Sequence, residues 1–145
     1  MATAERRANV VWRGNLFKGS GTFDLVSSEA IQDMPVTWAS RTERPDGKTS
    51  PEELIAAAHA SCYAMAFSNT LAEQGNEPEE LNINAVCTFD ADQLKVTTMI
   101  LDVRGRVPGL DAEGFQNAAE RAEQVCPVSN ALRGNVDIQV NASLD

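Results

Sequence analysis

SPEELIAAAHASCYAMAFSNTLAEQG, residues 50–75, decides the fold of this chain, because it carries the signals of one long helix. Ser50 is a favourable N-cap, Pro51 suits the first helical position, and Glu53 stands where a capping box places its acidic residue. We therefore predict a helix over residues 51–74, ended by the glycine that follows. Its middle is small or apolar on every face, which is typical of a helix that other elements bury on all sides.

Upstream of this helix the sequence predicts strands and turns. Strand-forming residues occupy 10–13, 16–18 and 22–26, and glycine-containing turns separate them, so we expect a small antiparallel meander. The stretch TWASRTERPDGK, residues 37–48, is charged and rich in turn-forming residues. We expect a surface loop there, of the kind that carries functional residues.

Downstream of the helix the pattern predicts a hairpin, two helices and a last strand. Residues 81–89 alternate between apolar and polar, and 95–106 form a second strand, which gives a hairpin with one buried face. A helix over 112–125 with an apolar stripe, a short helix through Leu132 and a closing strand over 136–140 follow. This order of elements is that of an α+β domain.

The composition narrows the class of protein. A chain of 145 residues without a repeat or linker is expected to form one domain, 1–145. Its 12 Lys+Arg against 21 Asp+Glu give a net charge of -9, which disfavours nucleic acid and anionic membranes as partners. No apolar run approaches the roughly 20 residues that span a bilayer, and residues 1–10 lack the apolar segment of a secretory signal. We therefore expect a cytoplasmic protein.

The chain holds three cysteines and one histidine. The cysteines lie far apart without a C-x-x-C pair, and His59 offers the one imidazole ligand, so we expect no metal site. Cys87 lies on the inward face of its strand, where a free cysteine packs as a small apolar side chain.

Cys62 and Cys126 each admit two interpretations from position alone. Cys62 lies in the middle of the long helix, three residues after His59, so that imidazole and thiol share a helix face. Cys126 precedes Pro127 at the N-cap position of a new helical turn, where backbone N–H groups favour a thiolate. For each, a buried core residue and a functional thiol are about equally expected. Their separation in sequence leaves a disulfide open.

Two blocks of sequence resemble one protein family. PEELIAAAHASC, residues 51–62, and VCPVSNAL, residues 125–132, occur in the order found in the osmotically inducible (OsmC) and organic hydroperoxide resistance (Ohr) proteins. The early W-R-G and K-G-S-G turns suit the same layout, so the resemblance covers essentially the whole chain, and it is closer to the OsmC branch. It implies the OsmC-like α+β fold, with antiparallel sheets, a long buried central helix and an intertwined homodimer.

The resemblance also implies a cysteine-based peroxidase. Cys62 matches the family's peroxidatic cysteine, and Cys126 matches the cysteine that resolves its sulfenic acid as an intramolecular disulfide. The implied substrates are organic hydroperoxides and, more weakly, hydrogen peroxide, which are reduced to alcohol and water. The resemblance implies no bound cofactor. An external dithiol, dihydrolipoamide or a lipoylated protein, restores the thiols.

Arg41 and Glu52 match two further site residues of the family. Arg41 matches the arginine that partners the nucleophile in the OsmC branch, and Glu52 matches the glutamate that orients this arginine. Arg44 is the alternative arginine, and both arginines also fit as solvated loop charges. Glu52 and Cys62 are about 15 Å apart along a helix that rises 1.5 Å per residue, so a long Arg41 or a second chain must bridge them.

Two other functions compete with the peroxidase. The first is a non-enzymatic stress-response module that binds a ligand and holds Cys62 and Cys126 as core thiols. The second is a hydrolase in which His59 activates Cys62, but no Asn or Asp that would orient the imidazole is evident. We expect His59 to have a packing or hydrogen-bonding role instead.

Overall fold

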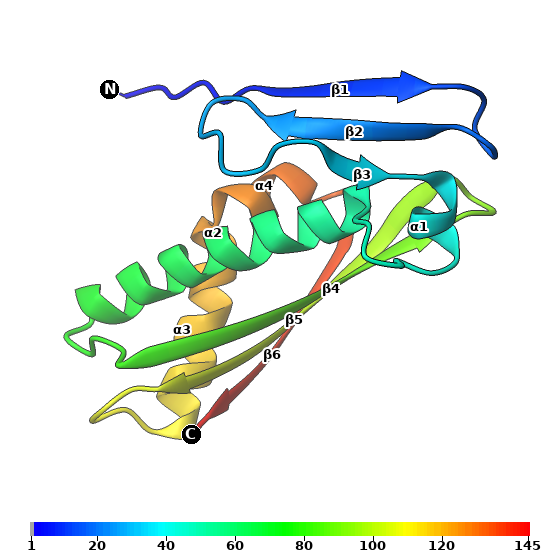
Figure 1. The fold of residues 1–145 in the computed structure, drawn as a ribbon. Helices are drawn as coiled ribbons and strands as arrows, with labels where there is room; N and C mark the ends of the chain where they lie inside the picture. The colour runs from blue at the N-terminus through cyan, green and yellow to red at the C-terminus, as the bar shows by residue number, and fades with distance from the viewer. Residues whose placement is uncertain (1) are drawn as a thin grey trace. The chain divides into compact units, whose positions relative to one another are not determined.

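The computed structural model describes residues 2–145 of the chain (Figure 1). Its elements are, in order, β1 (Ala8–Arg13), β2 (Ser20–Leu25), β3 (Met34–Val36), α1 (Trp38–Thr42), α2 (Pro51–Glu73), β4 (Glu80–Asp90), β5 (Lys95–Arg106), α3 (Ala112–Val125), α4 (Pro127–Leu132) and β6 (Asp137–Leu144). The chain forms two compact units, the first ending at Glu53 and the second beginning at Leu54. This mixture of helices and sheets confirms the α+β prediction.

The first unit carries a three-stranded antiparallel sheet in the order β1–β2–β3. The predicted meander is confirmed for β1 and β2, but the strand predicted over 16–18 is wrong, because these residues lie in the turn between them. Asn15 is the physical reason. Its side-chain oxygen accepts from the N–H of Lys18 at 2.8 Å, and its carbonyl accepts from the N–H of Gly19 at 2.8 Å. These local bonds hold the segment in a turn.

The loop predicted over 37–48 contains the short helix α1 and is therefore a loop only in part. Thr37 caps this helix, since its side chain accepts from the N–H of Ser40 while Ser40 Oγ accepts from the N–H of Thr37. Ser40 Oγ also donates to the carbonyl of Thr49 at 2.9 Å. The capping box begins α1, and the bond to Thr49 ties it to the segment that enters α2.

Helix α2 begins and ends close to the predicted residues. The N–H of Glu53 donates to Ser50 Oγ at 3.1 Å, which confirms the predicted N-cap bond. The Glu53 carboxylate accepts from the hydroxyl of Thr49 at 2.6 Å. At the other end Gly75 adopts φ +86°, in the left-handed region that glycine enters without a steric penalty, and its N–H closes the last turn on the carbonyl of Ala72 at 2.9 Å.

Within the single chain α2 is buried on one face rather than on every face. The buried stripe consists of His59, Tyr63, Phe67 and Leu71, which follow one another at a spacing of four residues. On the opposite face Met65 is 69% exposed. The prediction of burial on every face is therefore wrong for the single chain. It relied on apolarity alone, whereas the sheet and helices of one chain cover one side of α2.

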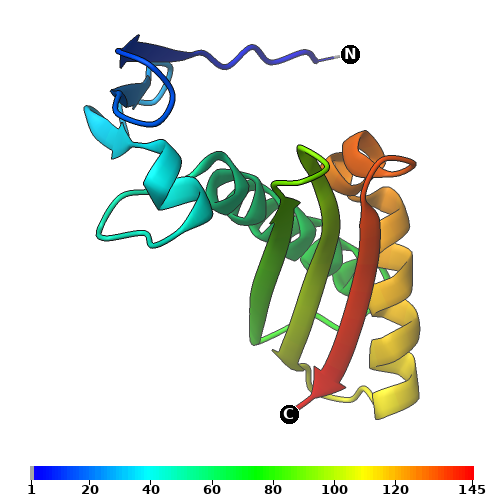
Figure 2. The ribbon, with the colours of Figure 1, turned by 90° about the vertical axis from the view of Figure 1, so that its right-hand side faces the viewer.

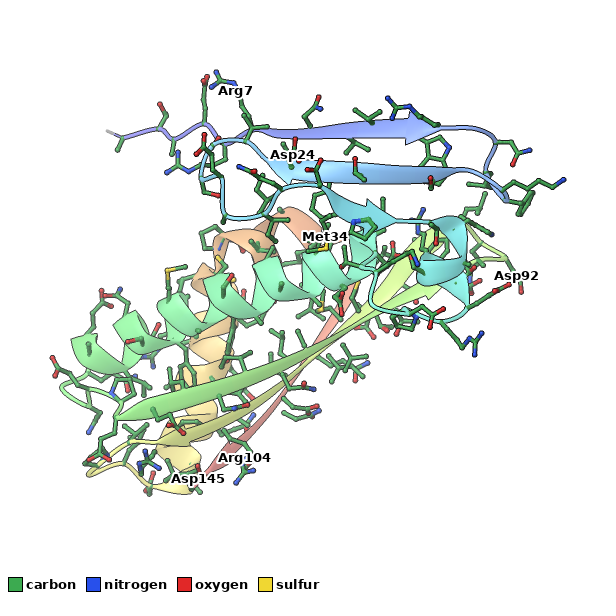
Figure 3. All side chains as sticks on the ribbon, viewed as in Figure 1. Arg7, Asp24, Met34, Asp92, Arg104 and Asp145 are labelled. Carbon is green, nitrogen blue, oxygen red and sulfur yellow. The ribbon has the colours of Figure 1, made fainter. Side chains whose placement is uncertain are left out.

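The second unit is a three-stranded sheet in the order β4–β5–β6, and Figure 2 shows the three strands side by side with α3 along them. The predicted hairpin is confirmed: β4 and β5 pair antiparallel from Glu80↔Arg106 to Asp90↔Lys95. β6 pairs parallel with β5, because α3 and α4 form the crossover that returns the chain to the same end of the sheet. Near the C-terminus Arg104 on β5 bonds Asp145 at 2.9 Å (Figure 3).

The core of the second unit lies between one face of this sheet and helices α2 and α3. Its fully buried members are Tyr63, Phe67 and Leu71 from α2, Met99, Leu101 and Val103 from β5, Phe115, Ala118, Ala119 and Ala122 from α3, and Cys126. The aromatic rings of Phe67 and Phe115 meet at 5.1 Å between centroids. Gly105 allows α3 to approach β5 this closely, because a Cβ there would lie 2.6 Å from the Phe115 ring.

Across residues 2–145, every helix is too short or too polar to pass through a lipid bilayer.

Candidate active site

Two cysteines from different helical segments meet in the second unit. Cys62 lies in the middle of α2 and is half-buried, and Cys126 is fully buried between α3 and α4. As predicted, Cys126 is the N-cap residue of α4 and Pro127 is the first residue of that helix, but the Cys126 side chain makes no capping bond. The two thiols are neighbours instead, close enough to influence each other's protonation, and the backbone N–H of Val128 faces the Cys62 sulfur. Both cysteines are free thiols.

The surroundings of Cys62 favour its neutral form. Burial raises the pKa of the Cys62 thiol above its usual value, and this is the largest effect. The N–H of Val128 lowers that pKa, while the neighbouring Cys126 raises it. A reactive thiolate at Cys62 therefore requires a positive charge in addition to what these neighbours supply.

Arg41 and Glu52 form a fork-shaped ion pair in the first unit. Arg41 Nε donates to Glu52 Oε1 at 3.0 Å, and Arg41 Nη2 donates to Glu52 Oε2 at 2.9 Å. The Glu52 side chain is 8% exposed and that of Arg41 is 30% exposed. The guanidinium also lies 5.8 Å from the ring centroid of Trp38, within range of a cation–π contact. Arg44 is exposed, and the arginine that Glu52 bonds is Arg41.

The four predicted site residues thus form two pairs, one in each compact unit. Arg41 forms an ion pair with Glu52, and the Cys62 thiol lies next to the Cys126 thiol. Their catalytic roles stay predictions.

The hydrogen-bonding role predicted for His59 is confirmed, and its partner is Ser129, a residue that the sequence analysis did not single out. His59 Nε2 and Ser129 Oγ are 2.6 Å apart, and both residues are fully buried. Among residues 2–145 His59 Nδ1 finds no hydrogen-bond partner, and burial lowers the pKa of the imidazole. Neither ring nitrogen bonds Cys62, so the geometry does not support the hydrolase alternative. Ser129 follows Cys126 by three residues, and His59 precedes Cys62 by three residues. This matching spacing is the feature of the sequence from which the His59–Ser129 pair could have been predicted.

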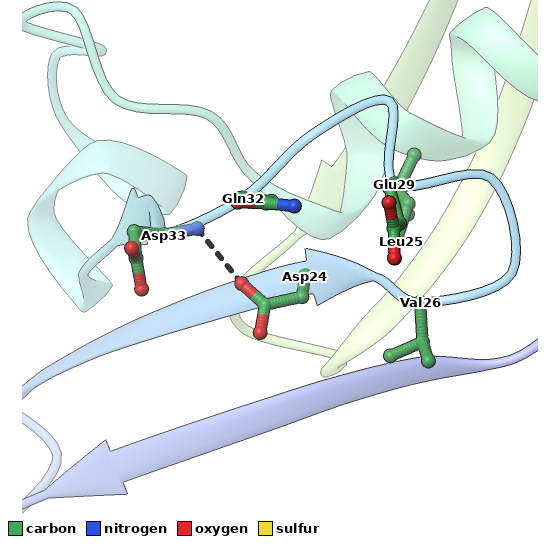
Figure 4. A pocket seen from close by; sticks show the side chains of 6 residues that line it. All are labelled: Asp24, Leu25, Val26, Glu29, Gln32 and Asp33. Atoms are coloured by element: carbon green, nitrogen blue, oxygen red, sulfur yellow. Dashed lines mark hydrogen bonds between the residues drawn. The ribbon is translucent and has the colours of Figure 1, made fainter.

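The third cysteine, possible metal ligands and a pocket in the first unit are the other candidates for a functional site, and none of them places reactive groups together as the two cysteines do. Cys87 is half-buried and packs against the core, as predicted. Within 2–145, no three His, Cys, Asp or Glu side chains gather as they would to bind a metal ion. A pocket in the first unit is lined by Asp24, Leu25, Val26, Glu29, Gln32 and Asp33 (Figure 4). The Asp24 carboxylate in it accepts from the N–H of Asp33 at 2.8 Å and so stabilises the loop.

An α+β scaffold that brings a half-buried thiol on a long helix against a second thiol is typical of two-cysteine redox proteins. The profile of the OsmC-like protein family matches residues 44–141, and the chain belongs to this family.

Individual relatives support the same family. "Peroxiredoxin OsmC" of Escherichia coli (strain K12) is 33% identical over 138 residues, which cover 94% of this chain and 95% of that protein. An "Organic hydroperoxide resistance protein" of Xanthomonas axonopodis pv. citri is 35% identical over 92 residues, 62% of this chain and 63% of that protein. A crystal structure from Legionella pneumophila, described as an organic hydroperoxide resistance protein OsmC, covers 99% of both chains with a TM-score of 0.71 at 24% identity. This last likeness confirms the fold.

The buried imidazole of His59 predicts a pH-dependent stability. Because its pKa is lowered in the folded chain, the unfolded chain binds more protons as the pH falls below about 6.5, the ordinary value for histidine. The stabilisation is therefore complete above that pH and is lost as the pH falls through the folded-state pKa. We expect the free energy of unfolding of the wild type to fall more steeply from pH 7 to pH 5 than that of His59→Gln, measured by urea denaturation. Parallel profiles would contradict this assignment.

Proposed function

We propose that this chain is a thiol-dependent peroxidase that reduces organic hydroperoxides to alcohols and water. The observation that carries the proposal is the pair of neighbouring free thiols, a half-buried Cys62 with the buried Cys126 beside it. The names of the relatives, a peroxiredoxin and an organic hydroperoxide resistance protein, support the same activity. A ligand-binding module does not require two thiols in contact, which makes that alternative the weaker one.

In the proposed reaction Cys62 is the nucleophile. Its thiolate attacks the distal oxygen of the hydroperoxide, the O–O bond breaks, and the alkoxide leaves and takes a proton to become the alcohol. Cys62 is then a sulfenic acid. The Cys126 sulfur attacks the Cys62 sulfur, the hydroxyl leaves as water, and a disulfide remains. Two electrons have passed from the dithiol to the peroxide. An external dithiol returns two electrons and two protons.

We assign the positive charge that Cys62 requires to Arg41. The two bonds to Glu52 hold one edge of the guanidinium, at Nε and Nη2, and the Glu52 carboxylate is only 8% exposed, so this pair fixes the plane of the cation. A cation near the sulfur favours the thiolate and offsets the effect of burial on the pKa. Glu52 acts on the reaction through the orientation of Arg41.

We further propose that the working unit is a homodimer. Two apolar surfaces lack cover in the single chain, one on α2 around Met65 and one on the first unit, where Val10 is 61% exposed and Phe17 is 77% exposed. Apolar surfaces of this kind are typical of protein–protein interfaces. In this proposal residues 1–145 act as one OsmC-like domain, and two copies cover each other's apolar surfaces.

The reductant that we propose is an external dithiol in the cytoplasm, dihydrolipoamide or a lipoylated protein, and no bound cofactor takes part. Organic hydroperoxides are the better substrates in this proposal and hydrogen peroxide the weaker one, because an alkyl group adds apolar contacts that hydrogen peroxide lacks.

Substitution of each cysteine tests the mechanism. After one equivalent of cumene hydroperoxide we expect the wild type and Cys87→Ser to lose the mass of two hydrogens, with a Cys62–Cys126 disulfide found by peptide mapping. Cys62→Ser should consume no peroxide, because the nucleophile is absent. Cys126→Ser should oxidise at Cys62 without forming the internal disulfide. Retained turnover in Cys62→Ser with a dithiol would overturn the assignment.

Arg41 is tested against its neighbour Arg44. We expect Arg41→Met to lower kcat/KM for cumene hydroperoxide by about tenfold or more, since a hydrogen bond to a charged group contributes about 1.5–3 kcal/mol. Its pH–rate profile should move to higher pH, because removal of a cation disfavours the thiolate. Arg44→Met is the matched control and should stay within about twofold of the wild type. An equal loss in both variants would contradict the role of Arg41.

The dimer is tested by light scattering. At micromolar concentration we expect twice the chain mass of 15.6 kDa. Met65→Asp should shift the protein towards the monomer, because it places a charge in the proposed interface. Val86→Asp is the control, since Val86 is also an exposed apolar residue, 47% accessible, but lies on the polar face of β4. A folded wild-type monomer at this concentration would refute the proposal.

A further inference from the structure

A buried hydrogen bond connects the two segments that carry the cysteines. His59 precedes Cys62 on α2 by about 4.5 Å of helix rise, and Ser129 lies one turn after Cys126 on α4. His59 Nε2 and Ser129 Oγ are 2.6 Å apart, with both side chains fully buried. The bond therefore lies about one helical turn from the thiol pair on each segment.

The C-terminal end of α4 is held towards α3 by Arg133, which bonds both Asn130 and Glu123, while its N-terminal end has fewer polar contacts. Helix α4 has six residues, Cys126 gives it no side-chain cap, and its backbone continues from α3 through Cys126–Pro127. The hydroxyl of Ser129 bonds His59, and the N–H of the preceding residue, Val128, faces the Cys62 sulfur. Two contacts with α2 at neighbouring residues restrict both the position of α4 and its rotation about its own axis. The direction of the Cys126 side chain depends on that rotation.

We propose that His59 and Ser129 are positioning residues: their hydrogen bond holds the Cys126 segment against α2 and sets the rate at which Cys126 captures the Cys62 sulfenic acid. This inference rests on the proposed function. The first step, attack of Cys62 on the peroxide, uses one cysteine. The second step forms an S–S bond and releases water, and it requires the two Cβ atoms to approach to about 3.5–4.5 Å.

A loosened α4 has a definite chemical consequence. A sulfenic acid that is not captured reacts with a second peroxide molecule, gains one oxygen to become a sulfinic acid, and releases a second alcohol. The His59–Ser129 bond thus favours the reversible disulfide over irreversible oxidation of Cys62. Either neutral tautomer of His59 maintains it, since Nε2 can donate to or accept from the serine hydroxyl.

Rapid quenching with dimedone and mass spectrometry separates the two steps. We expect Ser129→Ala to keep the rate of Cys62 oxidation by cumene hydroperoxide within about threefold of the wild type. Disulfide formation should slow by about tenfold or more, and sulfinic acid at Cys62 should rise at equal peroxide excess. His59→Gln is the conservative variant, because its amide retains a donor and an acceptor for Ser129, and it should restore rapid disulfide formation.

Tyr63→Phe is the matched control. It removes another buried bond of α2, the one that the Tyr63 hydroxyl donates to the carbonyl of Ala119 on α3 at 2.8 Å, and breaks no hydrogen bond of α4. It should destabilise the chain to a similar extent and leave disulfide formation within about twofold. An equal slowing in Tyr63→Phe and Ser129→Ala, or none in Ser129→Ala, would overturn the proposal.

A second measurement does not depend on peroxidase activity. In a redox buffer of reduced and oxidised dithiothreitol, the equilibrium between the Cys62–Cys126 dithiol and its disulfide reports how closely the thiols are held. We expect Ser129→Ala to shift this equilibrium about fivefold towards the dithiol, and Tyr63→Phe to leave it unchanged. A wild type that forms this disulfide but does not react with peroxide would refute the proposed function and leave the positioning role supported. An unshifted equilibrium in Ser129→Ala would refute the positioning role alone.

Discussion

The packing of one face of α2 against the sheet β4–β6 and helix α3 is the constraint on which the second unit depends. His59, Tyr63, Phe67 and Leu71 form that face, and each is fully buried. Burial of large side chains of this kind supplies most of the free energy that orders such a unit. Because the stripe fixes the rotation of α2, it also fixes where Cys62 points. The chemistry of the site therefore depends on core packing as much as on the thiols.

The same burial creates a chemical conflict that the proposed site must resolve. An apolar environment raises the pKa of the Cys62 thiol, whereas peroxide reduction needs the thiolate. The chain contains a guanidinium that Glu52 holds through two bonds along one edge, which is the type of oriented cation that stabilises an anion. In our proposal this chain, whose net charge is -9, therefore depends on one oriented arginine for the positive charge that the Cys62 thiolate requires.

Local signals explain which elements could be predicted. The Ser50 cap and the glycine after α2 bound that helix correctly, and alternation predicted the hairpin of β4 and β5, because caps and periodicity act within a few residues. The strand predicted over 16–18 failed because the bonds made by Asn15 favour a turn over the intrinsic preference of those residues. Helix α1 was missed although its Thr-x-x-Ser capping box was present in the sequence.

The sequence by itself determined the α+β class, the bounds of the long helix and, through its two motif blocks, the family. Only the tertiary structure decided that Cys126 lies against Cys62, that Glu52 binds Arg41 rather than Arg44, and that His59 bonds Ser129. The physical reason is one of range. Caps and periodic patterns are set by neighbours along the chain, whereas these contacts join segments up to 70 positions apart that meet when the core closes.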